Sequence, residues 1–295
     1  MIRIATEADK ADIVELLRHA PFRHIHADWR LPIDWLGEKS FVVMPKLPLP
    51  AKFTSLTSKL FAPRCMLSGC LAATTDPFPA AWVRAAAVDQ VRQPEAVLGD
   101  MLTHVIAVLR ETAVSQLGWL IVDKWPMAWL PEFGFQQVNE IETYIKPDLS
   151  LPSVQPKIEL TIRQVVPDDL ARLAEIEVAA FEPLWRHSLD SLRLAQSQTV
   201  NFTVAVWRGQ VVGFQFSTAA RQRGAHLSRM TVDPAMQGMG VGSALLTHAI
   251  ESYRQRGLQY VSLNTQVDNY PSLKLYRKFE FEPTQDRLPV MVKTL

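Results

Sequence analysis

The chain has 295 residues, of which 48% are hydrophobic and 21% are charged, so a collagen-like or wholly disordered protein is excluded. At roughly 150 residues per domain, this length predicts two domains. The 31 Lys and Arg residues balance the 30 Asp and Glu residues, giving a formal net charge of +1. A dedicated nucleic-acid binder is usually clearly basic, so we expect no nucleic-acid partner.

The N-terminal segment and the cysteines indicate the compartment. Residues 1–17 carry charges throughout and lack the apolar core of a secretory signal, and no run approaches the ~18 apolar residues of a membrane span. The two cysteines, Cys65 and Cys70, fit neither a disulfide framework nor a zinc-site spacing. We therefore expect a cytoplasmic protein with free thiols, no metal site and no membrane association.

A proline-rich segment near the midpoint divides the chain. Residues 146–157 contain three prolines, which exclude helix and disfavour a central strand. The predicted domains are therefore residues 1–147 and 158–295, joined by a linker at 148–157. A second proline-rich stretch, residues 45–50, is interpreted as a long loop within the first domain.

The two halves repeat each other. Each opens with a short strand, an acidic helix cap and an amphipathic helix, starting at Ile2 and at Leu160. A constant offset of 144 aligns residues 88–89 with 232–233 and residues 102–104 with 246–248. Residues 133–135 likewise match 279–281, and a closing apolar strand follows in each half, at 141–145 and 289–292. The pattern indicates a tandem duplication.

The second half shows the clearer element order. Strands are predicted at residues 202–207, 211–216, 227–232 and 260–264, with a tight hairpin turn at 208–210. Helices are predicted at 241–256, capped by Gly257, and at 272–278. With the opening strand and helix and the closing strand, the order is β-α-β-β-β-α-β-α-β. It predicts an α/β fold of the α+β type, with a mixed, mostly antiparallel sheet flanked by helices.

A glycine-rich loop carries the candidate chemistry. The predicted strand ends at Val232, Pro234 blocks its continuation, and glycines at 238, 240 and 242 precede a helix. Such spacing lets backbone amides approach an anion, and the helix N-terminus adds its own N–H groups, which suits a pyrophosphate. The segment lacks the Gly-Lys of a P-loop and the G-x-G-x-x-G spacing of the dinucleotide fingerprint.

In this segment the chain resembles the GNAT superfamily of acyl-CoA-dependent N-acyltransferases. The family's phosphate loop, Q/R-x-x-G-x-G/A, is matched by residues 237–242 following Val232-Asp233-Pro234. A second family motif, N-x-x-A-x-x-L-Y-x-K-x-G-F, is similar to residues 269–281, with Ser272 replacing the alanine and Glu280 replacing a glycine. Glu280 would therefore have to hold a left-handed or rearranged turn. The resemblance covers residues 158–295.

The resemblance implies two tandem GNAT-like domains and a site for acetyl-CoA. Tyr276 would protonate the departing thiolate, Asn269 would hydrogen-bond the pantetheine or nearby backbone, and the strand edge at Met230 and Val232 would pair with the pantetheine arm. The backbone amides expected to hold the pyrophosphate are those of Gln237, Gly238, Met239, Gly240, Val241, Gly242 and Ser243.

The implied reaction is direct attack of a primary amine on the acetyl carbonyl, with a backbone N–H near Met230 stabilising the oxyanion. The general base stays open among Glu177, Glu182 and His226. The acceptor is a small-molecule or peptide amine, and a homodimer is also left open. The alternative is a non-catalytic acyl-CoA sensor or interaction protein on the same scaffold. The intact Tyr276 and glycine loop favour the enzyme.

The first half has lost the corresponding features. Opposite the glycine loop stand residues 93–98, Gln-Pro-Glu-Ala-Val-Leu, in which Pro94 has no amide hydrogen and Glu95 would oppose a phosphate. Leu98 is bulky where a glycine is needed, and Leu130 stands opposite Tyr276. We therefore expect a degenerate GNAT-like first domain that does not bind coenzyme A in the usual way.

Overall fold

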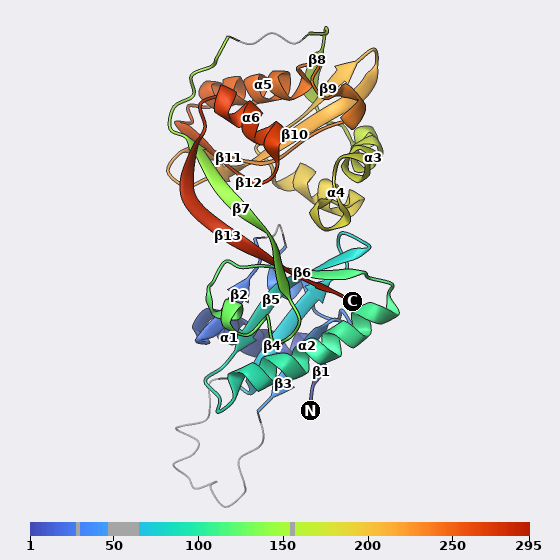
Figure 1. Ribbon diagram of the computed structural model, residues 1–295, viewed down its shortest axis with the longest axis vertical. Helices are drawn as coiled ribbons and strands as arrows, with labels where there is room; N and C mark the ends of the chain where they lie inside the picture. The colour runs from blue at the N-terminus through green and yellow to red at the C-terminus, as the bar shows by residue number, and fades with distance from the viewer. Residues whose placement is uncertain (28–29, 47–64, 154–156) are drawn as a thin grey trace, which may run out of the picture. The chain divides into compact units, whose positions relative to one another are not determined.

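The computed structural model describes residues 1–27, 30–46, 65–153 and 157–295, which form two compact units (Figure 1). Unit 1 comprises Met1–Val138 together with Val290–Leu295, and unit 2 comprises Asn139–Pro289. Residues 47–50 of the predicted loop and residues 154–156 of the predicted linker lie outside the described residues. Among the described residues, no helix is long and apolar enough to cross a membrane.

Unit 1 is a mixed sheet between two helices. Helix α1 (Lys10–His19) packs on one face and α2 (Pro94–Glu111) on the other. Pairing is antiparallel except between β5 and β6, which run parallel, and β2 (Phe22–Ile25) adds to β5. The strand order is β1 (Arg3–Ile4), β3 (Phe41–Pro45), β4 (Leu67–Thr74), β5 (Ala80–Val88), β6 (Gln116–Leu120) and the end of β13 (Glu282–Thr294).

The central strands of unit 1, β3, β4 and β5, are largely buried on both faces. Successive residues of a strand point to opposite faces, so Val42 packs in the cluster with α2 while Val43 packs in the cluster with α1. Leu71 and Cys70 divide in the same way. This double burial explains why the strands read as nearly continuous apolar runs in the sequence.

Unit 2 has the same layered organisation. Figure 1 shows α3 (Leu170–Ala180) and α4 (Leu189–Gln198) on one side of the sheet, and α5 (Val241–Gln255) and α6 (Tyr270–Lys278) on the other. Helix α4, capped by the Ser188 hydroxyl, was not predicted. The strand order is β8 (Thr161–Gln164), β9 (Asn201–Trp207), β10 (Gln210–Ala220), β11 (Gly224–Val232), β12 (Tyr260–Gln266) and β7 (Gln136–Lys146).

A repeated ion pair marks the two units as copies of one fold. In unit 1, Arg3 donates to both oxygens of Asp9, at 2.7 and 2.5 Å. In unit 2, Arg163 donates to both oxygens of Asp169, at 2.6 and 2.8 Å. Each aspartate also accepts a backbone N–H at 2.9 Å three residues before it, fixing the strand-to-helix connection. The predicted mixed sheet flanked by helices is thus confirmed, twice.

The two halves exchange their closing strands. The strand predicted at residues 141–145 pairs antiparallel with β12 of unit 2, and residues 290–294 of β13 pair antiparallel with β6 of unit 1. The sequence predicts that each strand closes its own half, which the pairings contradict. Alternating hydrophobicity identifies a strand but does not determine which neighbouring strand it pairs with. The compact units accordingly differ from the predicted ranges 1–147 and 158–295 at residues 139–157 and 290–295, since unit 2 also includes the predicted linker at 148–157.

Three predicted turns are confirmed. Arg208 and Gly209 have φ values of 48° and 78° between β9 and β10, as a two-residue hairpin requires. Gly257, at φ 67°, ends α5 with the Leu258 amide donating to the Tyr253 carbonyl at 3.0 Å. Glu280 holds the left-handed conformation at φ 62°, and its carboxylate lies 3.3 Å from Lys146 Nζ. That ion pair gives the non-glycine residue a stabilising contact.

Candidate active site

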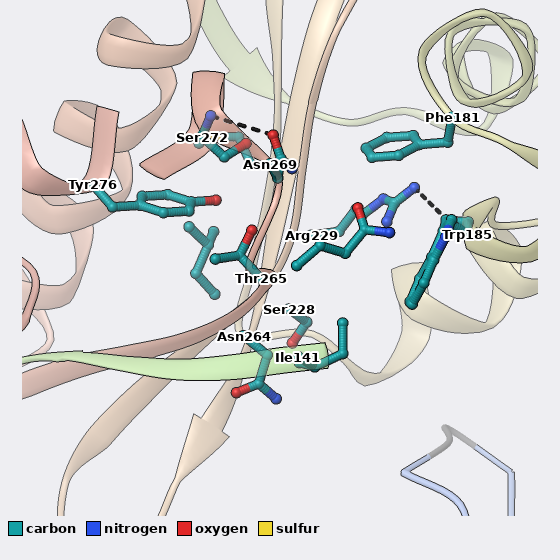
Figure 2. A pocket seen from close by; sticks show the side chains of 13 residues that line it. Ile141, Phe181, Trp185, Ser228, Arg229, Asn264, Thr265, Asn269, Ser272 and Tyr276 are labelled. Atoms are coloured by element: carbon teal, nitrogen blue, oxygen red, sulfur yellow. Dashed lines mark hydrogen bonds between the residues drawn. The ribbon is translucent and has the colours of Figure 1, made fainter. Parts of the chain in front are cut away.

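The candidate site lies where two parallel strands of unit 2 stop pairing. Strand β11 pairs with β12 over Gly224–Leu227 and Tyr260–Leu263. The residues that follow on both strands line a pocket of about 100 Å³ (Figure 2). The lining comprises Ile141, Phe181, Trp185, Leu227, Ser228, Arg229, Met230, Asn264, Thr265, Gln266, Asn269, Ser272 and Tyr276.

Tyr276, predicted as the proton donor, reaches the pocket from α6. Its ring packs against Phe281 at 5.6 Å, and Figure 2 shows its hydroxyl directed into the pocket. Burial raises the pKa of Tyr276 to about 12, although the hydrogen bond with Ser272 and the Arg229 charge oppose the shift. The phenol is therefore fully protonated at neutral pH and can donate a hydrogen bond.

Asn269 lines the same pocket and starts α6. Its side-chain oxygen accepts the Ser272 N–H at 3.3 Å, the dashed contact in Figure 2. This is a helix cap, which fixes the direction of the Asn269 amide and of the helix that carries Tyr276. Met230, predicted at the cofactor edge, also lines the pocket, while Val232 lies further along β11 toward the glycine loop.

Glu177, a candidate base, is occupied by a buried ion pair. Its carboxylate accepts Nε of Arg229 at 3.0 Å, the Thr231 hydroxyl at 2.6 Å and the His187 backbone N–H at 2.8 Å. Burial opposes ionisation, yet the Arg229 charge holds the pKa of Glu177 below its ordinary value. A charged carboxylate whose oxygens are already bonded is better suited to positioning Arg229 than to accepting a proton.

Arg229 is held on the pocket wall by several groups at once. Besides Glu177, it donates to the Trp185 carbonyl at 2.8 Å and lies over the Phe181 ring at 3.8 Å. Phe181 and Trp185 follow α3, so these contacts fix the segment after that helix against β11. Figure 2 shows the two aromatic residues and Arg229 facing one side of the pocket.

The remaining two base candidates lie outside the pocket lining. His226 is on β11 where it still pairs with β12, and its Nδ1 lies 3.0 Å from the Ser262 hydroxyl. Burial lowers the pKa of His226, so its imidazole is neutral at neutral pH. Glu182 is exposed at the start of the short helix Pro183–Trp185.

The glycine loop has the backbone geometry that an anion site requires. Gly238 and Gly240 have φ values of 76° and 93°, and Gly240 caps α5 in the left-handed conformation. The first bond of α5 runs from the Ala244 N–H to the Gly240 carbonyl at 3.0 Å, so by helix geometry the preceding three amides have no intrahelical acceptor. A Cβ at Gly242 would come within 3.2 Å of the Leu275 side chain. The loop therefore fits a pyrophosphate approached by backbone amides.

The equivalent edge in unit 1 is occupied by the chain itself. Strand β6 pairs with β5 over Ala80–Trp82, and β2 then pairs with β5 over Ala85–Val88. By the offset of 144, residues 85–88 correspond to 229–232, the part of β11 beside and beyond the pocket. Helix α2 begins with Pro94 at its first turn, and Leu98 is fully buried.

Sequence reasoning missed most of the pocket wall. Phe181 and Trp185 could have been suspected, because both follow the predicted first helix of the second half. Arg229 and Glu177 could not be paired from their positions, which lie 52 residues apart. Ile141 had no local signal at all, since it arrives on the exchanged strand β7.

Known proteins share this fold and the site-bearing segment. Residues 170–281 match the family model described as Acetyltransferase (GNAT) family. A GCN5-related N-acetyltransferase from Sphaerobacter thermophilus superposes with a TM-score of 0.60 at 17% identity, covering 100% of this chain and 95% of that one. A tandem GNAT protein from the clavulanic acid biosynthesis pathway superposes with a TM-score of 0.55 at 16% identity, covering 98% and 90%.

The second half of the chain is similar to the GNAT superfamily, whose family model it matches over residues 170–281, and the fold is shared with solved GNAT structures. Among curated relatives, a mycothiol acetyltransferase of Thermomonospora curvata is 29% identical over 191 residues, which cover 60% of this chain and 63% of that protein. The first curated relatives are matched over 51% to 83% of their own length.

Proposed function

We propose that the protein is an N-acetyltransferase that moves an acetyl group from acetyl-CoA to a primary amine, with unit 2 as the active unit. The observation that carries the proposal is the pocket at the fork of β11 and β12, with the Tyr276 hydroxyl directed into it. Strand β11 leads from this pocket to the glycine loop within a few residues. Strand β11 would thus connect the proposed phosphate loop with the pocket into which the Tyr276 hydroxyl is directed.

The residues that we propose hold acetyl-CoA are those that the resemblance implies. The amides of residues 237–243 would bind the pyrophosphate, the edge of β11 at Met230 and Val232 would bind the pantetheine arm, and Asn269 would contact that arm or nearby backbone. When bound, acetyl-CoA supplies an acyl group activated as a thioester. The relatives named as acetyltransferases support this donor.

Direct attack by the amine fits the residues of the pocket. The chain's two cysteines lie in unit 1, where both are buried, so the pocket offers no thiol for an acyl-enzyme route. The amine nitrogen forms a bond to the carbonyl carbon while the carbon–sulfur bond breaks. Tyr276 gives its proton to the sulfur, and the excess proton on nitrogen leaves to solvent or to a base.

The raised pKa of Tyr276 refines its role. The sequence suggested an ordinary tyrosine pKa near ~10 against a thiol pKa near ~8.5. With a pKa of about 12, Tyr276 is a weaker acid than expected. The buried site also disfavours a thiolate, so the proton moves as negative charge develops on sulfur rather than before it.

A tyrosine variant tests the proposal against the alternative of a non-catalytic acyl-CoA sensor. Tyr276→Phe removes the proton donor, so turnover should fall by about 10²- to 10⁴-fold. Release of free coenzyme A thiol measures turnover, and calorimetry measures acetyl-CoA binding, which should stay within about twofold of the wild-type value. Tyr270→Phe is the matched control, because Tyr270 lies on the same helix and is 73% exposed.

The outcomes separate the two functions. Binding of acetyl-CoA without turnover by the wild-type chain on a broad panel of amines would favour the sensor. Turnover that survives Tyr276→Phe would remove Tyr276 from the mechanism. The likeness to mycothiol acetyltransferases adds the mycothiol series to the small-molecule and peptide amines that the panel should contain.

We also propose that unit 1 does not bind acetyl-CoA, so that unit 2 is the active unit. Strand β2 holds the backbone edge of β5 that corresponds to the edge of β11 beside the pocket. The proline at the start of α2 and the buried Leu98 replace two glycines of the loop. A cytoplasmic location and a homodimer remain part of the proposal, to be checked by fractionation and by the mass in solution.

A further inference from the structure

The wall of the pocket includes a residue from the other half of the sequence. Ile141 lies on β7, the strand that follows the first repeat and joins the sheet of unit 2. Figure 2 shows Ile141 on this strand, close to Ser228 and Asn264 at the side of the pocket away from Tyr276. The pocket is therefore built from both halves of the duplicated chain.

Strand β7 also orders its neighbours in the pocket. Ile141 is directly opposite Gln266, and Thr143 is directly opposite Asn264, whose side-chain oxygen accepts the Thr143 hydroxyl at 3.0 Å. Gln266 and Asn264 both line the pocket. Asn139 extends the same edge by donating to both oxygens of Asp268, at 3.0 and 3.1 Å.

The chemistry of the wall separates it from the reacting end. Helix α6 and its cap contribute the hydroxyl and amide groups of Tyr276, Ser272 and Asn269. Strands β7 and β12 contribute a separate apolar and amide surface, formed by Ile141, Asn264 and Gln266. The charge of Arg229 is compensated by Glu177. This surface suits the uncharged body of an acceptor, and Ile141 is the aliphatic side chain that β7 contributes to it.

We propose that Ile141 is a specificity-determining residue, which limits the size of the acceptor that can reach the acetyl group. This inference rests on the proposed function. Because the side chain sits on a paired strand rather than a loop, its position is fixed by the ladder with β12. A change of volume at residue 141 should therefore change which amines fit, without changing how acetyl-CoA is held.

The experiment compares Ile141→Ala and Ile141→Trp with Ile145→Ala in the full-length chain. Ile145 is the matched control: it is on the same strand and the same face, opposite Ser262, and lies outside the pocket lining. The acceptor probes are ethanolamine, glucosamine, alaninamide and phenylalaninamide, with coenzyme A release as the readout. Each variant's acetyl-CoA KM and melting temperature report on the donor site and on folding.

The expected result is a change in the ratio of kcat/KM between large and small amines. Ile141→Trp should lower this ratio by about tenfold or more, and Ile141→Ala should raise it, since one pocket contact is worth about 10- to 200-fold in discrimination. Ile145→Ala should leave the ratio within twofold, and the acetyl-CoA KM should not move in any variant.

Two results would overturn the inference, and they are distinguishable. If the wild-type chain acetylates these amines but the ratio is unchanged in both Ile141 variants, or changes equally in Ile145→Ala, the specificity role is wrong while the proposed function stands. If the wild-type chain acetylates neither these amines nor any amine of the broad panel, the proposed function fails and this inference fails with it.

Discussion

At the scale of single residues, burial acts differently on each ionisable group. It raises the pKa of Tyr276 to about 12 and so keeps a proton on the candidate acid. It lowers the pKa of His24 to about 4 and so keeps that imidazole neutral. Glu177 is equally buried, yet Arg229 holds it ionised. The partner, and not burial alone, decides the protonation state.

The lowered pKa of His24 predicts that unit 1 loses stability at acidic pH. His24 binds a proton near pH 6.5 in the unfolded chain but only near pH 4 in the folded chain. The contribution of neutral His24 to the free energy of unfolding is therefore complete above pH 6.5 and declines between pH 6.5 and pH 4. The loss approaches about 3 kcal/mol at the acid end. Burial lowers the pKa of His26 as well, so it acts with the same sign.

Urea unfolding at pH 7 and pH 5, followed by tryptophan fluorescence, measures this effect, because six of the eight tryptophans precede residue 130. His24→Phe should reduce the difference in stability between the two pH values. His19→Gln should not, since His19 is an exposed side chain on α1. An unchanged difference in His24→Phe would show that other groups cause the acid sensitivity.

At the scale of elements, the glycine loop and β2 are the features that we propose decide where acetyl-CoA binds. The loop of unit 2 presents amides at positive φ, whereas the same place in unit 1 is the first turn of α2. The β5 edge is filled by β2, and the equivalent β11 edge borders the pocket. Calorimetry should accordingly find one acetyl-CoA per chain, and a second equivalent would contradict the proposed role of β2.

Gly238→Ala tests the loop. Alanine at φ 76° costs about 1–2 kcal/mol, and relief of that strain would turn the loop amides away, so acetyl-CoA affinity should fall by roughly 5- to 30-fold. Gly209→Ala is the control, because Gly209 has φ 78° and, like Gly238, open space around its missing Cβ. Both variants should lose similar stability, but only Gly238→Ala should lose affinity.

Local sequence patterns predicted the helices, strands and turns better than they predicted which strands pair with each other. The hairpin at Arg208, the cap at Gly257 and the strained Glu280 follow from residue-level rules and are confirmed. The exchange of β7 and β13 could not be predicted, because strand alternation is the same whichever sheet the strand joins. The site divides in the same way: Tyr276 and the loop carry motifs, while Arg229–Glu177 and Ile141 depend on tertiary contacts.

At the scale of the whole molecule, the exchanged strands make the two units depend on each other. Deletion of residues 290–295 should expose the edge of β6, because these residues pair with Gln116–Leu120. Hydrogen exchange should then accelerate at the β6 amides and stay unchanged at the β12 amides, which pair with β7. Equal acceleration in both strands would indicate general unfolding instead.

The exchange also sets an order of events during synthesis. Nearly all of unit 2 leaves the ribosome after β6 and before the part of β13 that completes the β6 edge. Strand β7, by contrast, is finished before any strand of the sheet it joins. The first half of the nascent chain is thus synthesised with an unpaired β6 edge, and it ends in a strand that completes the sheet of the second half.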